Sequence, residues 1–255
     1  MRLHFKTSGQ GQPLVILHGL FGSLDNWLGV TPRLAEHFHV FVVDLRNHGQ
    51  SPHSAEMNYP LMAEDVVKFF DARGLAQAAV LGHSMGGKVA MQFALSHPGR
   101  VGKLVVVDMA PRVYKPSHAA IFAALLALDL NSFQTRQQIE DVLGPAIPNL
   151  VVRRFLLKNL GRDEAGKFFW KINLRGIAEN YPLLGEALAA TTPFLKPALF
   201  LRGGKSNFIT AADEPLIRQL FPQAEMKTID AAAHWVHADK PEEFTDRVLK
   251  FLQAV

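Results

Sequence analysis

The 255-residue sequence contains no cysteine. This absence excludes disulfide bonds, a cysteine nucleophile and metal sites built from thiolates, and it is compatible with a reducing compartment. Signals for export or membrane insertion are also missing. The first residues lack a charged region followed by an apolar stretch and a small-residue cleavage site, so we expect no secretory signal. The longest apolar run, 119–128, falls short of the ~18 residues that span a membrane. We therefore expect a cytoplasmic protein without a membrane span.

Concentrated charge is absent as well. The net charge is +4, but Lys and Arg are scattered, and Arg153–Arg154 is the only tight basic pair in an apolar setting. Without a basic stripe that carries aromatic side chains, we expect no nucleic-acid partner. The hydrophobic content of 48% and charged content of 20% exclude a disordered composition and suffice for one sizeable core. The oligomeric state is not readable from the sequence.

Apolar runs alternate with helical patterns in the first half of the chain. Runs that are apolar throughout, rather than at every second residue, favour strands buried on both faces of a parallel sheet. A helix is predicted over 60–74, with a proline at its start and a glycine at its end, and two more are expected near Asp25 and after Ser84. This alternation predicts an α/β fold with a doubly wound sheet. The expected strands are 13–19, 39–45, 78–84, 103–109, 197–204 and 224–230.

Between about residues 114 and 193 the pattern changes. Strand-like runs become scarce, and amphipathic helices are predicted over 117–130, 132–144 and 149–161. The strand pattern then returns, and a final helix over 241–253 closes the chain. We therefore expect a core formed by 1–113 and 194–255, interrupted by a helical cap, or lid, formed by 114–193.

The strongest functional signal is Gly82-His83-Ser84-Met85-Gly86, which matches G-x-S-x-G. The pentapeptide is common by chance, but here an expected strand precedes it and an expected helix follows, as a nucleophile elbow requires. The serine of an elbow occupies a sharp turn, and the flanking glycines permit close backbone approach. The alternative is a glycine-rich turn that binds a phosphate or nothing. The context favours Ser84 as a nucleophile.

A serine hydroxyl is a weak nucleophile and needs a base. In this type of fold the chain order is serine, acid, histidine, so the base should follow the last strand. His234 and His237 are the candidates there. His234 lies in a loop of small residues four positions after the expected strand, and we favour it. His237 is then expected to be a surface residue or a neighbour of the base, while His18 and His83 are candidate polar contacts of the site.

With these motifs in view, the sequence resembles the α/β-hydrolases, and the YbfF-type esterases in particular. The resemblance spans nearly the whole chain except the predicted cap. It implies an α/β-hydrolase fold with a lid and a serine hydrolase acting on short-chain esters or thioesters. The blocks that carry it are HGLFGSLDNW (18–27), DLRNHGQSP (44–52), MNYP (57–60), GHSMGGK (82–88), DMAP (108–111) and HWVHADKPE (234–242).

One departure concerns the acid. Most α/β-hydrolases carry it after the strand that here reads PALFLRGG, often as Gly-x-x-Asp, but Ser206 occupies that position. Asp213 is nearby, but it is explained by the start of a helix. Asp108 ends the strand that follows the one leading to Ser84, and YbfF-type proteins have an aspartate at the matching place. We therefore predict Asp108 as the acid, the alternative being a cap of the turn before Pro111. Asp44 is expected to be structural.

The oxyanion hole requires two N–H donors. In this fold one belongs to the residue after the serine, here Met85, and the other to the glycine-containing loop after an early strand. Within LHGLFGS (17–23) we choose Leu20 first and Phe21 second. Phe21 and Trp235 are also candidates for substrate binding. Four aromatic residues of the predicted cap could line an acyl pocket, but apolar stripes are more typical of a core; they are Phe122, Phe168, Phe169 and Trp170.

These residues predict a carboxylic ester hydrolase with a Ser84–Asp108–His234 triad, working through an acyl-enzyme on small or short-chain acyl esters. No metal or organic cofactor is implied, and the expected partner is a small-molecule ester or thioester. An acyl-CoA thioesterase, a cofactor-free perhydrolase and a carbon–carbon hydrolase would use the same machinery. A dehalogenase or epoxide hydrolase is disfavoured, because such enzymes carry an aspartate where Ser84 stands. A non-catalytic protein that binds a small ligand under the lid would need only part of the triad.

Overall fold

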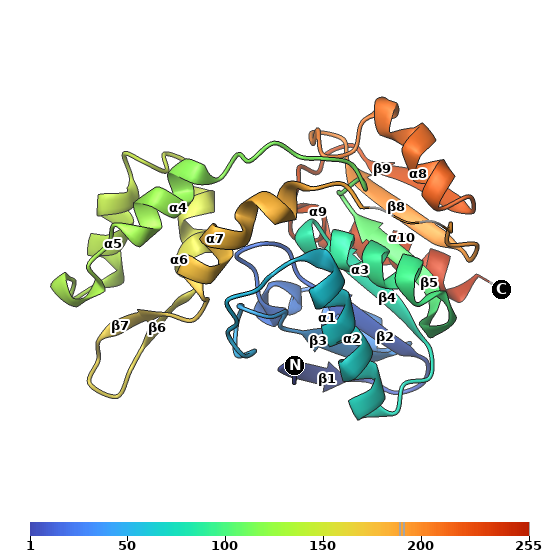
Figure 1. The fold of residues 1–255 in the computed structure, drawn as a ribbon, viewed down its shortest axis with the longest axis horizontal. Helices are drawn as coiled ribbons and strands as arrows, with labels where there is room; N and C mark the ends of the chain where they lie inside the picture. Colours follow the sequence, from blue (N-terminus) through green and yellow to red (C-terminus); the bar gives the residue numbers. More distant parts are fainter. Residues whose placement is uncertain (189, 191, 255) are drawn as a thin grey trace.

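The computed structural model of the protein describes residues 1–188, 190 and 192–254. Its centre is a seven-stranded sheet with the order β1-β3-β2-β4-β5-β8-β9 (Figure 1). β1 pairs antiparallel with β3, and the other neighbours run parallel. The six predicted strands are confirmed within two residues at each end, and β1 at the sheet edge was missed. The strands are β1 (Phe5–Ser8), β2 (Pro13–Leu17), β3 (His39–Val43), β4 (Ala78–His83), β5 (Val101–Val107), β8 (Ala198–Gly203) and β9 (Ala224–Ile229).

The sheet is buried on both faces, which explains the continuous apolar runs. Successive side chains of a strand point to opposite faces. In β2, Val15 and Leu17 accordingly pack into the core beneath α2 and α3, whereas Leu14 and Ile16 join the core beneath α1 and α10. α2 and α3 lie in front of the sheet in Figure 1. The fold is thus a parallel sheet with helices on both sides.

The helix patterns identify most helices of the core. α2 (Tyr59–Arg73) begins after Asn58, whose side chain accepts a hydrogen bond from the Leu61 N–H, and it ends at Gly74 with φ 67°. The helix predicted after Ser84 is α3 (Met85–Ser96), and the C-terminal prediction coincides with α10 (Pro241–Gln253). The helix expected near Asp25 is a short 3-10 turn over Leu24–Trp27 followed by α1 (Thr31–Ala35). Two further short helices are α8 (Glu214–Leu220) and α9 (Val236–Asp239).

Residues 114–193, which lie between β5 and β8 and are hereafter called the insertion, are found beside the sheet in Figure 1. Three of its helices are shorter than the patterns predicted, and the segment also contains the hairpin β6–β7, which was not predicted. The helix expected to reach residue 161 ends at Leu157, because the chain there turns into β6. Strands of three residues are too short to show an alternating pattern. The elements are α4 (Ala119–Leu126), α5 (Arg136–Leu143), α6 (Leu150–Leu157), β6 (Leu160–Arg162), β7 (Phe168–Trp170) and α7 (Leu174–Gly185).

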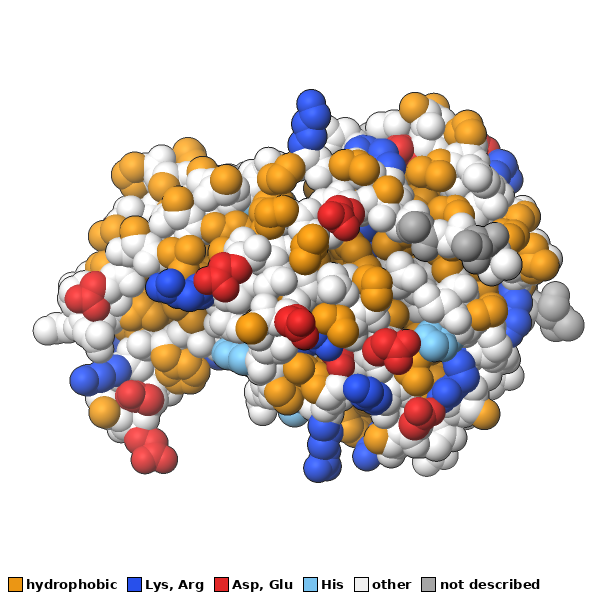
Figure 2. Space-filling model, viewed as in Figure 1, with side chains coloured by type: hydrophobic (Ala, Val, Ile, Leu, Met, Phe, Trp, Pro, Cys, Tyr) orange, Lys and Arg blue, Asp and Glu red, His pale blue; other side chains and the backbone are white. Residues whose placement is uncertain are grey.

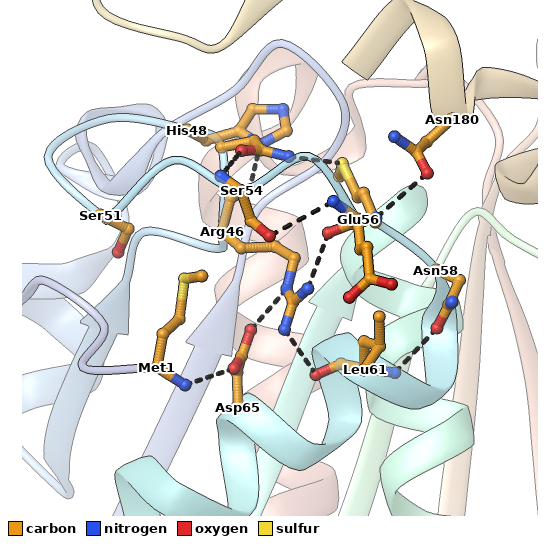
Figure 3. Close-up of polar contacts among 12 residues, drawn as sticks. Met1, Arg46, His48, Ser51, Ser54, Glu56, Asn58, Leu61, Asp65 and Asn180 are labelled. Carbon is orange, nitrogen blue, oxygen red and sulfur yellow. Dashed lines mark hydrogen bonds and ion pairs between the residues drawn. The ribbon is translucent and has the colours of Figure 1, made fainter. Parts of the chain in front are cut away.

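The loop over residues 44–58, hereafter the 44–58 loop, supports the insertion. The buried Arg46 guanidinium pairs through Nε with Asp65 at 2.6 Å and donates to the Glu56 carbonyl at 2.7 Å (Figure 3). The same loop contacts the insertion, since Asn180 Oδ1 accepts a hydrogen bond from the Met57 N–H at 3.2 Å (Figure 3). Arg46 therefore bonds the loop to the core, and Asn180 bonds it to the insertion.

A buried lysine makes a second connection to the insertion. Lys88, on α3, is completely buried and donates from Nζ to the Glu186 carbonyl at 2.5 Å. Burial lowers its pKa to about 8. Tyr59 lies beneath the same ammonium and donates to the Leu184 carbonyl at 2.7 Å. The last turn of α7 and the residue that follows it are therefore bonded to two helices of the core.

The surface shows no concentration of one charge sign on the face seen in Figure 2, where basic and acidic side chains are interspersed. Apolar side chains are exposed over the insertion; they include Leu126, Val142, Leu150, Val151, Phe169 and Leu183. No helix in the described part of the chain has the length and apolar character needed to cross a membrane.

Candidate active site

Ser84 lies between β4 and α3 in a strained backbone conformation, with φ 53° and ψ −120°. L-residues rarely adopt positive φ, and such strain persists only where the surroundings enforce it. The neighbouring glycines permit the close backbone packing around this turn. A Cβ on Gly82 would lie 2.1 Å from the Gly86 carbonyl oxygen, and a Cβ on Gly86 would lie 2.4 Å from the carbonyl oxygens of Leu17 and His18. The glycines of the motif thus allow α3 to start against β2.

Asp108 follows β5 directly and is fully buried. Its φ of 51° turns the chain at the strand end. Its carboxylate accepts hydrogen bonds from the Gly203 N–H at 3.1 Å and the Ser206 hydroxyl at 2.5 Å, and it contacts His234 Nδ1 at 2.7 Å. Three partners compensate the desolvation of this charge.

His234 connects the other two predicted residues. It lies in the loop between β9 and α9, with Nδ1 at 2.7 Å from Asp108 Oδ2 and Nε2 at 3.0 Å from the Ser84 hydroxyl. The Phe208 ring stacks on the imidazole, with centroids 3.8 Å apart and planes 20° from parallel. The structure therefore brings Ser84, His234 and Asp108 into one chain of hydrogen bonds.

The loop after β8 supports this arrangement. Ser206, at the position where most α/β-hydrolases carry the acid, donates to the Asp108 carboxylate. Phe208, two residues later, is the ring stacked on His234. Asp213 is engaged elsewhere: it pairs with Arg112 Nε at 2.8 Å and accepts from the Thr210 N–H and hydroxyl. Asp44 likewise has structural partners, accepting from the N–H groups of Leu24 and Gln50.

Leu20 and Met85, the residues predicted to supply the two N–H donors, both line the cavity that Ser84 lines. Met85 is the first residue of α3, whose initial N–H groups have no partner within the helix. Phe21, the second choice for a donor, gives its N–H to His48 Nε2 at 3.2 Å. This contact leaves Leu20 as the better candidate of the two.

The cavity beside Ser84 has a volume of about 790 Å³ and lies between the core and the insertion. Phe21 and Trp235 both line it, and Trp235 contacts Phe155 of the insertion with ring centroids 5.1 Å apart. The four aromatic residues of the insertion named from the sequence are not among its lining residues. Among the described residues of the insertion, Tyr114, Phe155 and Tyr181 are the Phe, Tyr or Trp side chains that do line it.

Four basic residues line the cavity, and within the described residues no Asp or Glu does. Arg154 is exposed and lies 3.4 Å from Glu140, and Lys115 and Lys158 are also exposed. Arg112 is half-buried and holds Asp213. The cavity is therefore apolar within and positively charged at these side chains.

Several histidines surround the site. His83 donates from Nε2 to the His234 carbonyl, 2.9 Å away. Burial lowers the pKa of His83 well below the ordinary value, with a further contribution from His234. His237 is buried and stacks on Trp27 at 4.2 Å between centroids, so the prediction of a surface position was wrong. Burial lowers its pKa to about 3. His237 is nevertheless close to the base, because the His83 ring packs against both His237 and His234.

Sequence reasoning missed two buried histidine contacts of the loop that carries Leu20. His18 was noted only as a candidate polar contact, and His48 was not singled out. His18 Nδ1 lies 2.8 Å from the Gly19 carbonyl, and His48 Nε2 accepts from Phe21. The sequence shows the glycine-rich turns in which both histidines lie. It does not show that Phe21 and His48, which are 27 residues apart, form a hydrogen bond. As for metals, the described residues contain no group of three or more His, Cys, Asp or Glu placed to hold an ion.

Comparison with known proteins identifies the family. The family described as alpha/beta hydrolase fold matches residues 12–241. The chain belongs to the α/β-hydrolase fold family. The prediction of this fold, with a mostly parallel sheet flanked by helices, is confirmed, and so is the resemblance to YbfF-type esterases. Esterase YbfF of Escherichia coli (strain K12) is 39% identical over 244 residues, which cover 94% of this chain and 92% of the relative.

Two other relatives extend the comparison. A zebrafish (Danio rerio) protein named sn-1-specific diacylglycerol lipase ABHD11 is 39% identical over 259 residues, covering 98% of this α/β-hydrolase and 81% of the relative. The solved structure of a marine microorganism esterase is 43% identical with a TM-score of 0.96, covering 98% of this chain and 99% of the other. The esterase and lipase names of these relatives support a hydrolase.

Proposed function

We propose that the protein is a serine carboxylesterase that cleaves small or short-chain acyl esters. The observation that carries the proposal is the continuous hydrogen-bond chain from the Ser84 hydroxyl through His234 to the buried Asp108 carboxylate. A nucleophile, a base and an orienting acid in this geometry define acyl transfer irrespective of sequence position. The esterase and lipase names of the relatives agree with it.

In the proposed mechanism, Ser84 attacks the ester carbonyl carbon while His234 Nε2 accepts its proton. Asp108 holds the imidazole in the tautomer with hydrogen on Nδ1 and stabilises the imidazolium that forms. The N–H groups of Leu20 and Met85 bind the tetrahedral oxyanion. His234 then protonates the departing alcohol. Water attacks the acyl-enzyme with His234 again as base, which releases the carboxylic acid and restores Ser84.

We further assign residues 114–193 as a lid over a core formed by 1–113 and 194–255. Support comes from the cavity, which core and insertion line together. Phe21 and Trp235 on the core side, facing Tyr181 and Phe155 of the insertion, would surround the acyl chain. The cavity of about 790 Å³ has room for a short acyl ester.

The test compares wild type with Ser84→Ala on p-nitrophenyl acetate and butyrate. We expect an initial burst of p-nitrophenol, equal to the enzyme concentration where deacylation is slower than acylation, and no burst from Ser84→Ala. Equal turnover by the two proteins would refute the assignment and leave a ligand-binding protein as the explanation of the cavity.

An acyl-CoA thioesterase is the second candidate, favoured by the basic residues around the cavity. Lys115 and Lys158 are exposed, and no acidic residue among those described lines the cavity, which suits a leaving group with phosphates. If this candidate is right, the double variant Lys115→Ala/Lys158→Ala should raise KM for butyryl-CoA several-fold at low salt and leave KM for p-nitrophenyl butyrate unchanged. Equal effects on both substrates would exclude it.

A further inference from the structure

The loop that carries Leu20 is held by partners on three consecutive peptide units. The first unit joins Gly19 to Leu20, and its carbonyl is contacted by His18 Nδ1 at 2.8 Å and by the Gly22 N–H at 2.9 Å. In a planar trans peptide the N–H points opposite to the carbonyl. Two contacts that fix the Gly19 carbonyl therefore also fix the direction of the Leu20 N–H.

The hydrogen positions at His18 and His48 follow from their neighbours. The Leu45 N–H donates to His18 Nε2 at 3.0 Å, so the hydrogen of the neutral ring is on Nδ1 and is donated to the Gly19 carbonyl. In the same way the Phe21 N–H donates to His48 Nε2, and His48 Nδ1 donates to the Arg46 carbonyl at 2.9 Å. Burial, which lowers the pKa of His48 to about 3, keeps that ring able to accept.

The third peptide unit, which joins Phe21 to Gly22, is held from the insertion. Asn159 is buried in the turn between α6 and β6, and its Nδ2 donates to the Phe21 carbonyl at 2.8 Å. The N–H of that same unit belongs to Gly22 and donates to the Gly19 carbonyl. A path of two hydrogen bonds and two peptide units thus links Asn159 to the Leu20 N–H.

The backbone of Phe21 is strained, so this path depends on the hydrogen bonds that hold Phe21 in place. Its φ is 58°, a region that a bulky L-residue adopts only when its surroundings hold it there. His48 holds its N–H from the core and Asn159 holds its carbonyl from the insertion. Loss of the Asn159 contact therefore removes one of the two side-chain hydrogen bonds on the Phe21 backbone.

We propose that Asn159 is a positioning residue that couples docking of the insertion to the oxyanion hole, by fixing the Phe21–Gly22 peptide and through it the Leu20 N–H. The inference rests on the proposed function, in which Leu20 is an oxyanion donor. The Leu20 N–H is then aligned only when the insertion is docked on the core, so that the oxyanion hole is complete only when the insertion covers the cavity.

The test uses Asn159→Ala and Asn159→Asp, of which the second keeps the side-chain shape and loses the N–H donor. Asn180→Ala is the matched control. Asn180 likewise bonds the insertion to a loop of the core, but to the 44–58 loop through the Met57 N–H and the Ala55 carbonyl, and not to Phe21. Active sites are titrated with a fluorophosphonate, so that kcat refers to folded enzyme, and thermal unfolding is followed for every variant.

Both Asn159 variants should lower kcat for p-nitrophenyl butyrate by about 10- to 100-fold, less than the ~10²–10³ that removal of a donor costs. KM should stay within about twofold, because the oxyanion forms only in the transition state. The Ki of n-butylboronic acid, which forms a tetrahedral adduct with an active-site serine, should rise by a similar factor. Asn180→Ala should retain kcat and Ki.

Two results would overturn the coupling while leaving the proposed function intact. One is unchanged kcat and Ki in both Asn159 variants beside an inactive Ser84→Ala. The other is an equal loss in Asn180→Ala, which would assign the effect to docking in general. If wild type and Ser84→Ala hydrolyse the ester equally, the proposed function fails and the coupling fails with it.

Discussion

At the scale of single residues, the carboxylate of Asp108 is the most constrained group of the candidate site. It is fully buried and has His234, Ser206 and the Gly203 N–H as partners. One oxygen, Oδ2, serves both the imidazole and the hydroxyl. Ser206 thus supports the carboxylate from the loop in which other members of the fold carry the acid itself.

Asp108→Asn should reduce kcat for p-nitrophenyl butyrate by orders of magnitude, up to the ~10⁴ seen when a serine protease loses its acid. An amide cannot stabilise the imidazolium, and its NH₂ group can force the wrong tautomer on His234. The measurement is steady-state kinetics at saturating ester, normalised by active-site titration.

Asp213→Asn is the matched control for this change. Asp213 is also a buried aspartate, but its partners are Arg112 and Thr210. Asp213→Asn should lower the free energy of unfolding, because it weakens a partly buried ion pair, and should leave kcat within a few-fold of wild type. Near wild-type kcat in Asp108→Asn would contradict the assignment of the acid.

Single residues of the site differ in how well the sequence predicts them. Ser84 is surrounded by a spaced motif, and Asp108 and His234 follow from chain order and strand ends, so the sequence indicates all three. Phe208 and Asn159 carry no such signal, because stacking and a backbone contact depend on where distant segments meet. Their parts in the site became visible only in three dimensions.

At the scale of elements, the approach of α3 to β2 and β4 shapes the turn at Ser84. Gly86→Ala would place a methyl group 2.4 Å from the Leu17 and His18 carbonyl oxygens, which are backbone atoms that cannot move independently. We expect a loss of about 1–3 kcal/mol or more in the free energy of unfolding, as for overpacked cores. Urea unfolding measures it.

Gly99→Ala provides the comparison, since a Cβ there would meet no atom of the described part of the chain within 4 Å. It should leave the urea midpoint unchanged or raise it slightly, because alanine restricts the unfolded chain more than glycine does. Equal midpoints for Gly86→Ala and wild type would show that α3 can shift away from β2, contrary to the close contact described above.

Elements were predictable where their patterns were long. The 13-residue α10 and the strands buried on both faces match their predicted ranges closely. The three-residue strands β6 and β7 and the edge strand β1, which is partly exposed, were missed. Short or half-exposed elements owe their conformation to pairing partners, and periodicity carries little information about those.

At the scale of the whole molecule, buried histidines make stability depend on pH, and His48 and His237 are two of them. Burial lowers the pKa of His48 and of His237 to about 3 each. In the unfolded chain both regain a pKa of about 6.5. Between pH 6.5 and 3 the unfolded state therefore binds more protons, and the folded state loses stability as the pH falls through this window. Each histidine contributes a slope of about 1.4 kcal/mol per pH unit.

His237→Phe should flatten this dependence. Phenylalanine can keep the stacking on Trp27, and it removes a buried Nδ1 that has no hydrogen-bond partner among the residues described by the structure. Urea unfolding from pH 7.5 to 4.5 should give a variant whose slope is lower by about one proton. His37→Gln, at an exposed histidine, should keep the wild-type slope. Parallel curves for His237→Phe and wild type would mean that His237 is protonated in the folded protein within this range, and that its burial against Trp27 does not control its titration.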